Sequence, residues 1–343
     1  MSIKYIPELD GLRAIAAIAV VAYHVRLPGV SGGFLGVDVF FVLSGYLTTA
    51  IALSGRYTPR EFIKKRFCRL WPLLLCVSAA VSLIVSLSGL AMWHEVIPGA
   101  LFLGNLSIIL LSPPKFMPHT WTLGAEMQFY VGLSFLVFTT ASISRFRVIA
   151  VSLFIISTAA RLHYSYGANW YDGYYSPLAH SSGLFLGAFL ATLPIERIRC
   201  APTLFAASIS VVFTAFIFAN AYTATALTFW ISIVEISSMG LIASLVSGVG
   251  VLGAALRTPV MRTLGAWSFG IYLWHYPIVV ISRGYLSPGE AFIISLSSAI
   301  ILAAMTYHLV ERSWAVSDRK WRRAQHGVFK SFSRVGSCDG ERM

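Results

Sequence analysis

Ionisable residues that interrupt long apolar runs are the first candidates for chemistry in this sequence. They are Arg13, His24, Asp38, Glu126, Glu235, His275 and the pair His308 and Glu311. A charged group inside hydrocarbon is costly unless it is paired or faces a cavity, so each is a functional candidate. Imidazoles and carboxylates are also common proton carriers in catalysis. The residue types therefore indicate general acid–base chemistry within an apolar protein.

Arg13 and His24 stand eleven positions apart in one apolar run. On a helix this spacing leaves the two side chains about 20° apart in azimuth and about 16 Å apart along the axis. They share a face but cannot touch. This suits a passage with an anionic group near Arg13 and proton transfer near His24. The alternative is an arginine that reaches the inner headgroups and a histidine bonded to a neighbouring helix.

A base at His24 needs a partner, because a carboxylate on the second ring nitrogen fixes the tautomer and stabilises the imidazolium. Glu126 and Asp38 are the available acids. We expect Glu126 at a depth similar to that of His24, with Tyr130 one turn deeper on the same face. Asp38 stands early in its segment and could instead complement a helix dipole. Glu235 is interpreted as a protonated, structural residue.

Residues 55–70 form a strongly basic stretch. Arg66 and Arg69 are three positions apart, so on a helix they share a face and could clamp phosphates. The alternative is a topological anchor that contacts lipid headgroups. The sequence contains neither a GxxxxGK[ST] loop nor a GxGxxG motif after a strand, which argues against nucleotide hydrolysis and Rossmann binding.

The composition requires a membrane around these residues. Of 343 residues, 57% are hydrophobic and 12% are charged, about half the charged share of a soluble protein. This predicts an all-α, polytopic transmembrane bundle with the lipid bilayer as its solvent. Disorder, a secreted disulfide scaffold and nucleic-acid binding fit this composition poorly. The four cysteines form no CxxC pair and no Cys/His cluster, so no metal site is expected.

The apolar runs define the candidate spans. They cover residues 11–26, 33–54, 71–91, 96–112, 121–140, 146–161, 180–194, 203–221, 226–252, 264–285 and 289–310. Basic loops concentrate on the cytoplasmic side, which places 55–70, 141–147 and the tail inside. An even number of crossings must then separate the first two loops.

The segment 96–112 is the one expected not to cross, since it is short and carries Gly and Pro residues. It is predicted to be a re-entrant or surface-lying segment on the outer side. Ten spans with both termini in the cytoplasm follow. Residues 1–315 are predicted to form the membrane domain and 316–343 a basic cytoplasmic tail. One outer loop, 162–179, is rich in Tyr and Trp. These aromatics form either an interfacial belt or a platform for a sugar or another polar acceptor.

Five segments together resemble membrane acyltransferase family 3. Residues 8–13 (ELDGLR), followed by His24 after ten intervening positions, are similar to its first-helix signature. Residues 36–46 (GVDVFFVLSGY) resemble its second-helix motif, and 66–69 (RFCR) its cytoplasmic Arg-x-x-Arg element. The matches keep their order from residue 8 to about residue 314.

The remaining matches lie later in the chain. Residues 121–130 (WTLGAEMQFY) are similar to a tryptophan-to-tyrosine motif that often carries two acids. Met127 follows the first acid here, so only Glu126 can take the acidic role. Residues 268–277 (SFGIYLWHYP) resemble a late-span motif.

The resemblance implies an O-acyltransferase of the bacterial cytoplasmic membrane. It would move an acyl group, with acetyl the expected one, from cytoplasmic acyl-CoA to a hydroxyl of an extracytoplasmic or lipid-linked glycan. No metal is implied. The alternative classes are a transporter or flippase of a polar substrate, which would also need intramembrane charges, and a non-catalytic scaffold.

Residue roles follow from this resemblance. His24 is the general base or, by a second route, the acyl carrier, with Glu126 orienting it. Arg13 neutralises a phosphate or polarises the thioester carbonyl, and Arg66 and Arg69 hold the CoA phosphates. A secondary set is expected to shape the site: Asp38, Ser44, Trp121, Tyr130 and His275.

Overall fold

A computed structural model describes residues 5–89, 96–111, 113–140, 142–166, 170–196 and 198–312. Throughout these ranges the chain is helical and has no strand. The long helices are α1 (Pro7–His24), α2 (Gly36–Leu53), α3 (Pro59–Leu87), α6 (Trp121–Thr139), α7 (Ile143–Tyr166), α10 (Ala201–Phe218), α11 (Ile231–Ser247), α12 (Pro259–Ser282) and α13 (Pro288–Thr306). The short ones are α4 (Ile97–Ala100), α5 (Gly104–Leu110), α8 (Trp170–Tyr175) and α9 (Ser182–Leu190).

The helical membrane architecture is confirmed. Within the described ranges, seven helical stretches are long and apolar enough to cross a bilayer. They are Gly33–Leu53, Pro59–Leu87, Ile143–Tyr166, Ala201–Phe218, Ala226–Ser247, Pro259–Ser282 and Pro288–Glu311. The expected count of ten is not confirmed, and the orientation of the termini stays a prediction. The predicted tail, 316–343, lies outside the described residues.

Two of the apolar runs contain helices that are much shorter than the runs themselves. The run 180–194 yields only α9, whose nine residues extend about 14 Å, too short to cross about 30 Å of hydrocarbon alone. The run ends early because its flanks fold into turns. The run 96–112 breaks into α4 and α5, of four and seven residues, and neither can span. That this run lies on the outer side stays a prediction.

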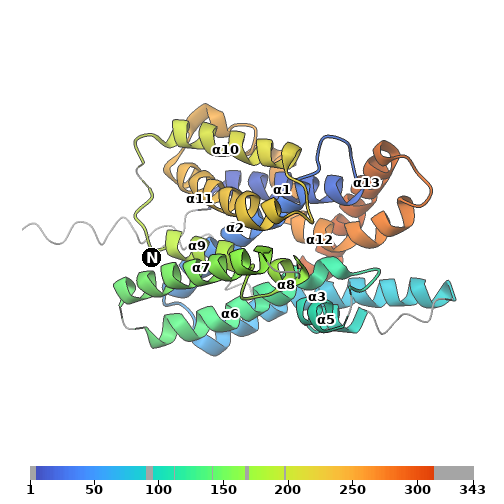
Figure 1. Ribbon diagram of the computed structural model, residues 1–343, viewed down its shortest axis with the longest axis horizontal. Coiled ribbons are helices and arrows are strands. Elements are labelled where there is room, and N and C mark those ends of the chain that lie inside the picture. Colours follow the sequence, from blue (N-terminus) through green and yellow to red (C-terminus); the bar gives the residue numbers. More distant parts are fainter. Residues whose placement is uncertain are drawn as a thin grey trace, which may run out of the picture.

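Helix α1 packs against α2 and α12 and also contacts α11 and α13 (Figure 1). Helix α2 packs closely on α9 through glycines: a Cβ on Gly45 would lie 2.1 Å from the carbonyl oxygen of Leu184, and one on Gly187 would lie 2.1 Å from that of Val42. Small residues let membrane helices approach in this way. Close approach of α2 to α9 and α1 brings their polar residues into one interior.

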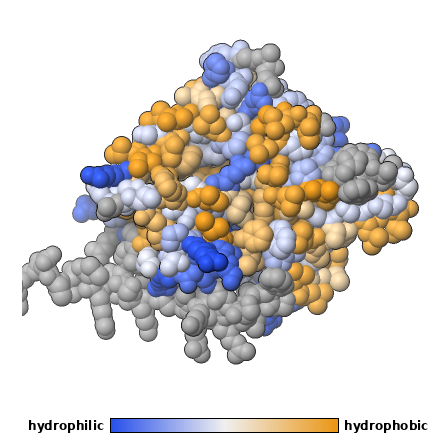
Figure 2. Space-filling model, turned by 90° about the horizontal axis from the view of Figure 1, so that it is seen from below, coloured by the Kyte–Doolittle hydropathy of each residue, from blue (hydrophilic) through white to orange (hydrophobic). Residues whose placement is uncertain are grey.

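The surface is predominantly apolar. Figure 2 shows hydrophobic side chains over much of one face of the molecule, interrupted by hydrophilic areas. Large exposed hydrophobic residues include Leu83 on α3, Phe135 on α6, Val148 on α7 and Ile293 on α13. In water such a surface would aggregate. It is the surface expected of helices that face lipid.

Helix α3 begins within the basic stretch and carries most of it. The Thr58 hydroxyl accepts from the Glu61 backbone N–H at 3.3 Å, and the Glu61 carboxylate accepts from the Thr58 N–H at 2.9 Å. This capping box, with Pro59 in the first turn, fixes the start of the helix. Arg66 and Arg69 therefore lie on a helix, as their expected shared face requires.

Candidate active site in the helix bundle

His24 is the last residue of α1, and its imidazole meets that of His275 on α12. Nδ1 of His24 lies 3.1 Å from Nε2 of His275 and 3.0 Å from the carbonyl oxygen of Val20. Nδ1 of His275 lies 2.6 Å from the carbonyl oxygen of Tyr272. His275 is fully buried, whereas His24 is partly accessible. The imidazole at the end of α1 is therefore partly exposed, and the buried imidazole of α12 contacts it.

These contacts select one tautomer for each ring when both are neutral. A carbonyl oxygen can only accept, so Nδ1 of His275 carries hydrogen and its Nε2 carries a lone pair. Nδ1 of His24 must then donate to His275, to the Val20 carbonyl, or to both. The Nε2 atom of His24 is left with a free lone pair. That atom can receive a proton from a substrate hydroxyl.

A third histidine extends the cluster. His119, in a short 3-10 turn before α6, has its ring centroid 5.2 Å from that of His275 and stacks on Tyr276 at the same separation. Its Nε2 lies 3.2 Å from the carbonyl oxygen of Leu273. Its Nδ1 is buried without a hydrogen-bond partner among the described residues. Sequence analysis missed His119 because it lies in a polar connection rather than in an apolar run.

Glu126 does not contact His24 and lies in a second polar centre. Its carboxylate accepts hydrogen bonds from the Ser44 hydroxyl on α2 and from the Tyr130 hydroxyl on its own helix. The Ser44 and Tyr130 hydroxyls are 3.0 Å apart. The expected Glu126–Tyr130 face is confirmed. The expected partnership of Glu126 with His24 is not what the structure shows, because His275 lies beside His24 instead.

Depth explains this separation. A Cβ on Gly36, at the start of α2, would lie 2.5 Å from the carbonyl oxygen of Ala16, and α2 runs back along α1 from there. Ser44 is eight residues further on, about 12 Å along the helix. His24 is eight residues from Ala16 in the opposite direction. The centre at Glu126 and the centre at His24 therefore lie at different levels of the bundle.

Two arginines, Arg13 and Arg66, lie near the Glu126 centre, and Arg69 lies near both of them. Arg13 interacts electrostatically with Arg69, Glu126 and Tyr130, and Arg66 with Arg69, Glu126 and Tyr130. The Arg66 side chain is only 5% exposed, and its guanidinium lies 5.8 Å from the Tyr130 ring centroid. Within the described part of the chain, the guanidiniums of Arg13 and Arg66 make no hydrogen bond. Such donors fit an anionic ligand, since charged groups are rarely buried unsatisfied.

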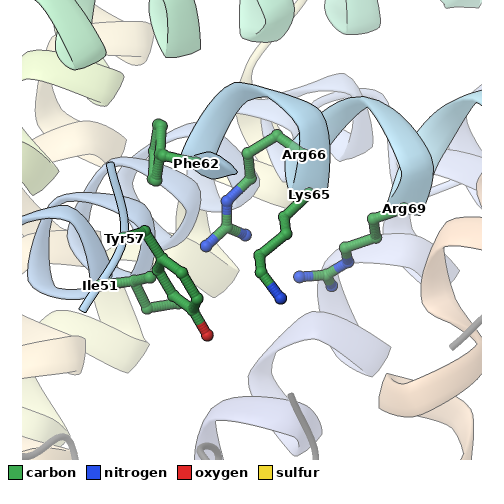
Figure 3. A pocket seen from close by; sticks show the side chains of 6 residues that line it. All are labelled: Ile51, Tyr57, Phe62, Lys65, Arg66 and Arg69. Carbon is green, nitrogen blue, oxygen red and sulfur yellow. The ribbon is translucent and has the colours of Figure 1, made fainter. Parts of the chain in front are cut away.

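The basic side chains at the start of α3 line one pocket. Lys65, Arg66 and Arg69 extend from the helix towards Tyr57 on the preceding loop (Figure 3). Ile51 and Phe62 complete the lining. The pair Arg66 and Arg69, expected to share a face, thus faces a shared space. Phosphates would meet both charge and hydrogen-bond donors there.

Asp38 lies in a third buried group, with His180 from the segment before α9. Nε2 of His180 is 2.8 Å from Oδ1 of Asp38, and Nδ1 is 2.6 Å from the Tyr174 carbonyl oxygen. Both imidazole nitrogens are therefore occupied. Trp121 packs its ring 5.1 Å from that of His180. This arrangement positions helices and leaves His180 no free lone pair for proton transfer.

Arg161 and Glu235 form a buried ion pair at 3.3 Å. Arg161 also donates to the Leu227 carbonyl oxygen at 3.0 Å and to the Ser232 hydroxyl at 2.9 Å. The sequence interpretation of Glu235 was a protonated, structural residue; the structure pairs it with Arg161, and its protonation and its role stay predictions. Arg161 and His180 were missed because each stands at the end of an apolar run, where a polar residue is ordinary.

No metal site is visible in the parts of the chain that the structure describes: nowhere do three His, Cys, Asp or Glu side chains converge in a metal-binding arrangement. The polar centres are thus built from hydrogen bonds and ion pairs between side chains of distant helices.

Known proteins are similar to this chain along most of its length. A family model described as an acyltransferase domain matches residues 6–308. The O-acetyltransferase OatA of Staphylococcus aureus strain NCTC 8325 is 29% identical over 345 residues, which are 90% of this chain and 57% of OatA. YrhL of Bacillus subtilis strain 168, whose name assigns it provisionally to peptidoglycan O-acetylation, is 30% identical over 346 residues, 90% of this chain and 55% of YrhL.

The chain spans little more than half the length of these relatives. No solved structure matches it. The family match covers every helix described above apart from the last residues of the structure, including all three polar centres. The chain therefore belongs to the acyltransferase domain family.

Proposed function

We propose that the chain is an O-acyltransferase of the bacterial cytoplasmic membrane. It transfers an acyl group, with acetyl the expected one, from cytoplasmic acyl-CoA to a hydroxyl of an extracytoplasmic or lipid-linked glycan. The observation that carries the proposal is the free Nε2 of His24, held by His275 at one level of the bundle, while unpaired arginines gather at another. The printed names of OatA and YrhL support O-acetylation as the reaction.

The donor enters at the pocket beside α3. Its phosphates bind Arg66 and Arg69, with Lys65 at the same opening. Its acyl-bearing arm then passes Arg13 and follows α1 for about 16 Å to His24. Glu126 offsets part of the arginine charge and holds Ser44 and Tyr130 beside this path. Arg13 lies on the route of the thioester rather than at the reacting atoms.

The reaction takes place at His24. Nε2 removes the proton of the acceptor hydroxyl while the hydroxyl oxygen attacks the thioester carbonyl. The carbon–sulfur bond breaks, and the proton passes from Nε2 to the departing thiolate. The Nδ1 proton stays hydrogen-bonded to His275 and the Val20 carbonyl, which stabilises the imidazolium in between. General-base help of this kind is worth roughly 10²–10⁴ in rate.

Purified full chain in detergent, supplied with labelled acetyl-CoA and a panel of sugars and small alcohols, tests the proposal. Acyl product is expected from the wild type and a loss of about 10²–10⁴ in turnover from His24→Ala. The matched control is His308→Ala, an exposed histidine on the last helical turn. Mass spectrometry after incubation with donor alone separates direct transfer from an acyl-His24 route.

Two outcomes would overturn the proposal. Movement of an intact substrate across liposomes without acyl product would identify a transporter or flippase. A scaffold would be identified if the wild type makes no acyl product and both His24→Ala and Glu126→Ala leave the protein's biological effect unchanged. Near-normal turnover of His24→Ala would remove this residue from the chemistry even if transfer occurs.

A further inference from the structure

Four tyrosines from four separate segments gather beside His24. Tyr23 precedes His24 on α1, Tyr276 belongs to α12, Tyr175 ends α8, and Tyr222 lies in the loop after α10. The His24 ring centroid is 5.1 Å from that of Tyr23 and 5.0 Å from that of Tyr276. Tyr175 interacts electrostatically with Tyr222, Tyr23 and Tyr276, and Tyr23 interacts with the Tyr222 side chain. The four phenols therefore lie near one another, and two of them lie directly beside the partly exposed ring of His24.

Trp170 extends this group. Its ring stacks on Tyr174 at 4.7 Å with an interplanar angle of 13°, and its centroid lies 4.6 Å from that of Tyr222. The indole Nε1–H is buried without a hydrogen-bond partner in the described ranges. We call Tyr23, Trp170, Tyr175, Tyr222 and Tyr276 the tyrosine mouth. It is continuous with the partly accessible ring of His24.

The tyrosine mouth differs from an interfacial belt. Belt side chains point away from the protein into the headgroup layer, as Tyr166 and Tyr285 do at 88% and 87% exposed. Tyr23, Tyr175 and Tyr276 are only partly exposed and face one another. Tyr222 is the exposed rim, and its φ of +62° is a left-handed conformation unusual for a residue with a side chain. Such strained positions concentrate at ligand sites.

The chemistry of the mouth matches a sugar. Aromatic faces pack against the C–H face of a pyranose ring, while phenol hydroxyls bond its hydroxyl groups. Burial raises the pKa of the Tyr175 phenol well above its usual value, so this hydroxyl stays protonated and can donate. Arg283 adds a fixed donor at the rim, because its guanidinium bonds the His24 carbonyl oxygen at 3.1 Å.

We propose that the tyrosine mouth is the acceptor subsite and binds one pyranose ring of a glycan, with a ring hydroxyl directed at Nε2 of His24. This rests on the proposed function and names the part of the site that selects the acceptor. Stacking and hydroxyl contacts, rather than a charge pair, then determine which hydroxyl is acylated. An alcohol without a ring lacks the stacking partner and binds poorly.

Binding is tested without catalysis by saturation-transfer NMR on the detergent-purified full chain, with chitotetraose as the sugar probe and glycerol as the ringless control. Transfer to the sugar ring protons is expected for the wild type and for Tyr285→Ala, whose exposed tyrosine lies outside the mouth. Tyr222→Ala should weaken the signal and lower affinity about tenfold, as expected for one aromatic contact. Equal signals from wild type and Tyr222→Ala would overturn the proposal.

Steady-state kinetics then distinguish the acceptor-subsite proposal from the proposed O-acyltransferase activity on which it rests. Tyr222→Ala and Tyr175→Phe should raise the KM for the sugar and leave the KM for acetyl-CoA unchanged. Acyl transfer to another alcohol, together with absent sugar binding, would overturn the tyrosine mouth and leave the O-acyltransferase intact. Sugar binding without acyl transfer would leave the mouth and overturn the O-acyltransferase.

Discussion

Nδ1 of His24 on α1 lies 3.1 Å from Nε2 of His275 on α12, although the two residues are 251 positions apart in the chain. The carbonyl oxygen of Tyr272 fixes the hydrogen of His275 on Nδ1. A neutral imidazole therefore occupies, beside His24, the position that a carboxylate takes in many catalytic dyads. A neutral partner avoids a second buried charge in a bundle that already pairs two acids with basic residues elsewhere.

His275 is expected to act by positioning His24. His275→Ala should lower kcat for acyl transfer by about 10- to 100-fold, less than the full effect of a general base, because His24 loses one of the two acceptors of its Nδ1 proton and the ring that packs against it. His275→Gln offers a carbonyl oxygen to the same proton and should recover part of that loss. Initial rates at saturating donor and acceptor measure both effects. Equal kcat for His275→Ala and wild type would assign the residue to packing alone.

Arg66 is expected to bind the donor. Arg66→Ala should raise the KM for acetyl-CoA by about 10- to 100-fold, since a hydrogen bond to a charged group contributes about 1.5–3 kcal/mol. Lys64→Ala is the matched control: it removes one charge from the same stretch of α3, but Lys64 is exposed and outside the pocket lining. Equal KM shifts in both variants would indicate a topology anchor and no phosphate site.

Spacing within one helix was predictable. Arg13 and His24 lie on α1, Arg66 and Arg69 on α3, and Glu126 bonds Tyr130 across one turn. All of these follow from 3.6 residues per turn. The membrane class was predictable from the composition. Helical spacing is a local property of the chain and composition is a sum over it, so neither depends on which helices are neighbours.

Contacts between helices were not predictable. Ser44 reaches Glu126 across 82 positions, and His275 reaches His24 across 251. Which helices are neighbours depends on packing of the whole bundle, and a single sequence does not state it. Arg161 was overlooked for a related reason. It ends an apolar run, where a charged residue is ordinary, but the helix continues past it to Tyr166.

Gly187 is expected to set the distance between α2 and α9. Gly187→Ala adds a Cβ that would lie 2.1 Å from the Val42 carbonyl oxygen, so the helices must separate. A cost of about 1–3 kcal/mol is typical of such overpacking, and the melting temperature in detergent should fall. Gly132→Ala is the control, because a Cβ there meets nothing within 4 Å and should change stability by less than about 1 kcal/mol. Equal melting temperatures would refute the close packing.

The buried pair of Arg161 and Glu235 is expected to show coupled energetics. Arg161→Met leaves the Glu235 carboxylate buried without its cation, and breaking a buried pair in this way costs about 3–5 kcal/mol. Adding Glu235→Gln removes the stranded charge. The double variant should therefore melt at a higher temperature than Arg161→Met, although it carries one more substitution.

Thermal unfolding of the full chain in detergent, followed by tryptophan fluorescence, measures this coupling. Arg145→Met is the matched control, since Arg145 is exposed on the first turn of the same helix and should shift the melting temperature little. If the double variant loses the sum of the two single losses, the residues are energetically independent. A positive coupling instead identifies the pair as the contact that holds α7 against α11, and with them the segments that carry Trp170 and Tyr175 of the tyrosine mouth.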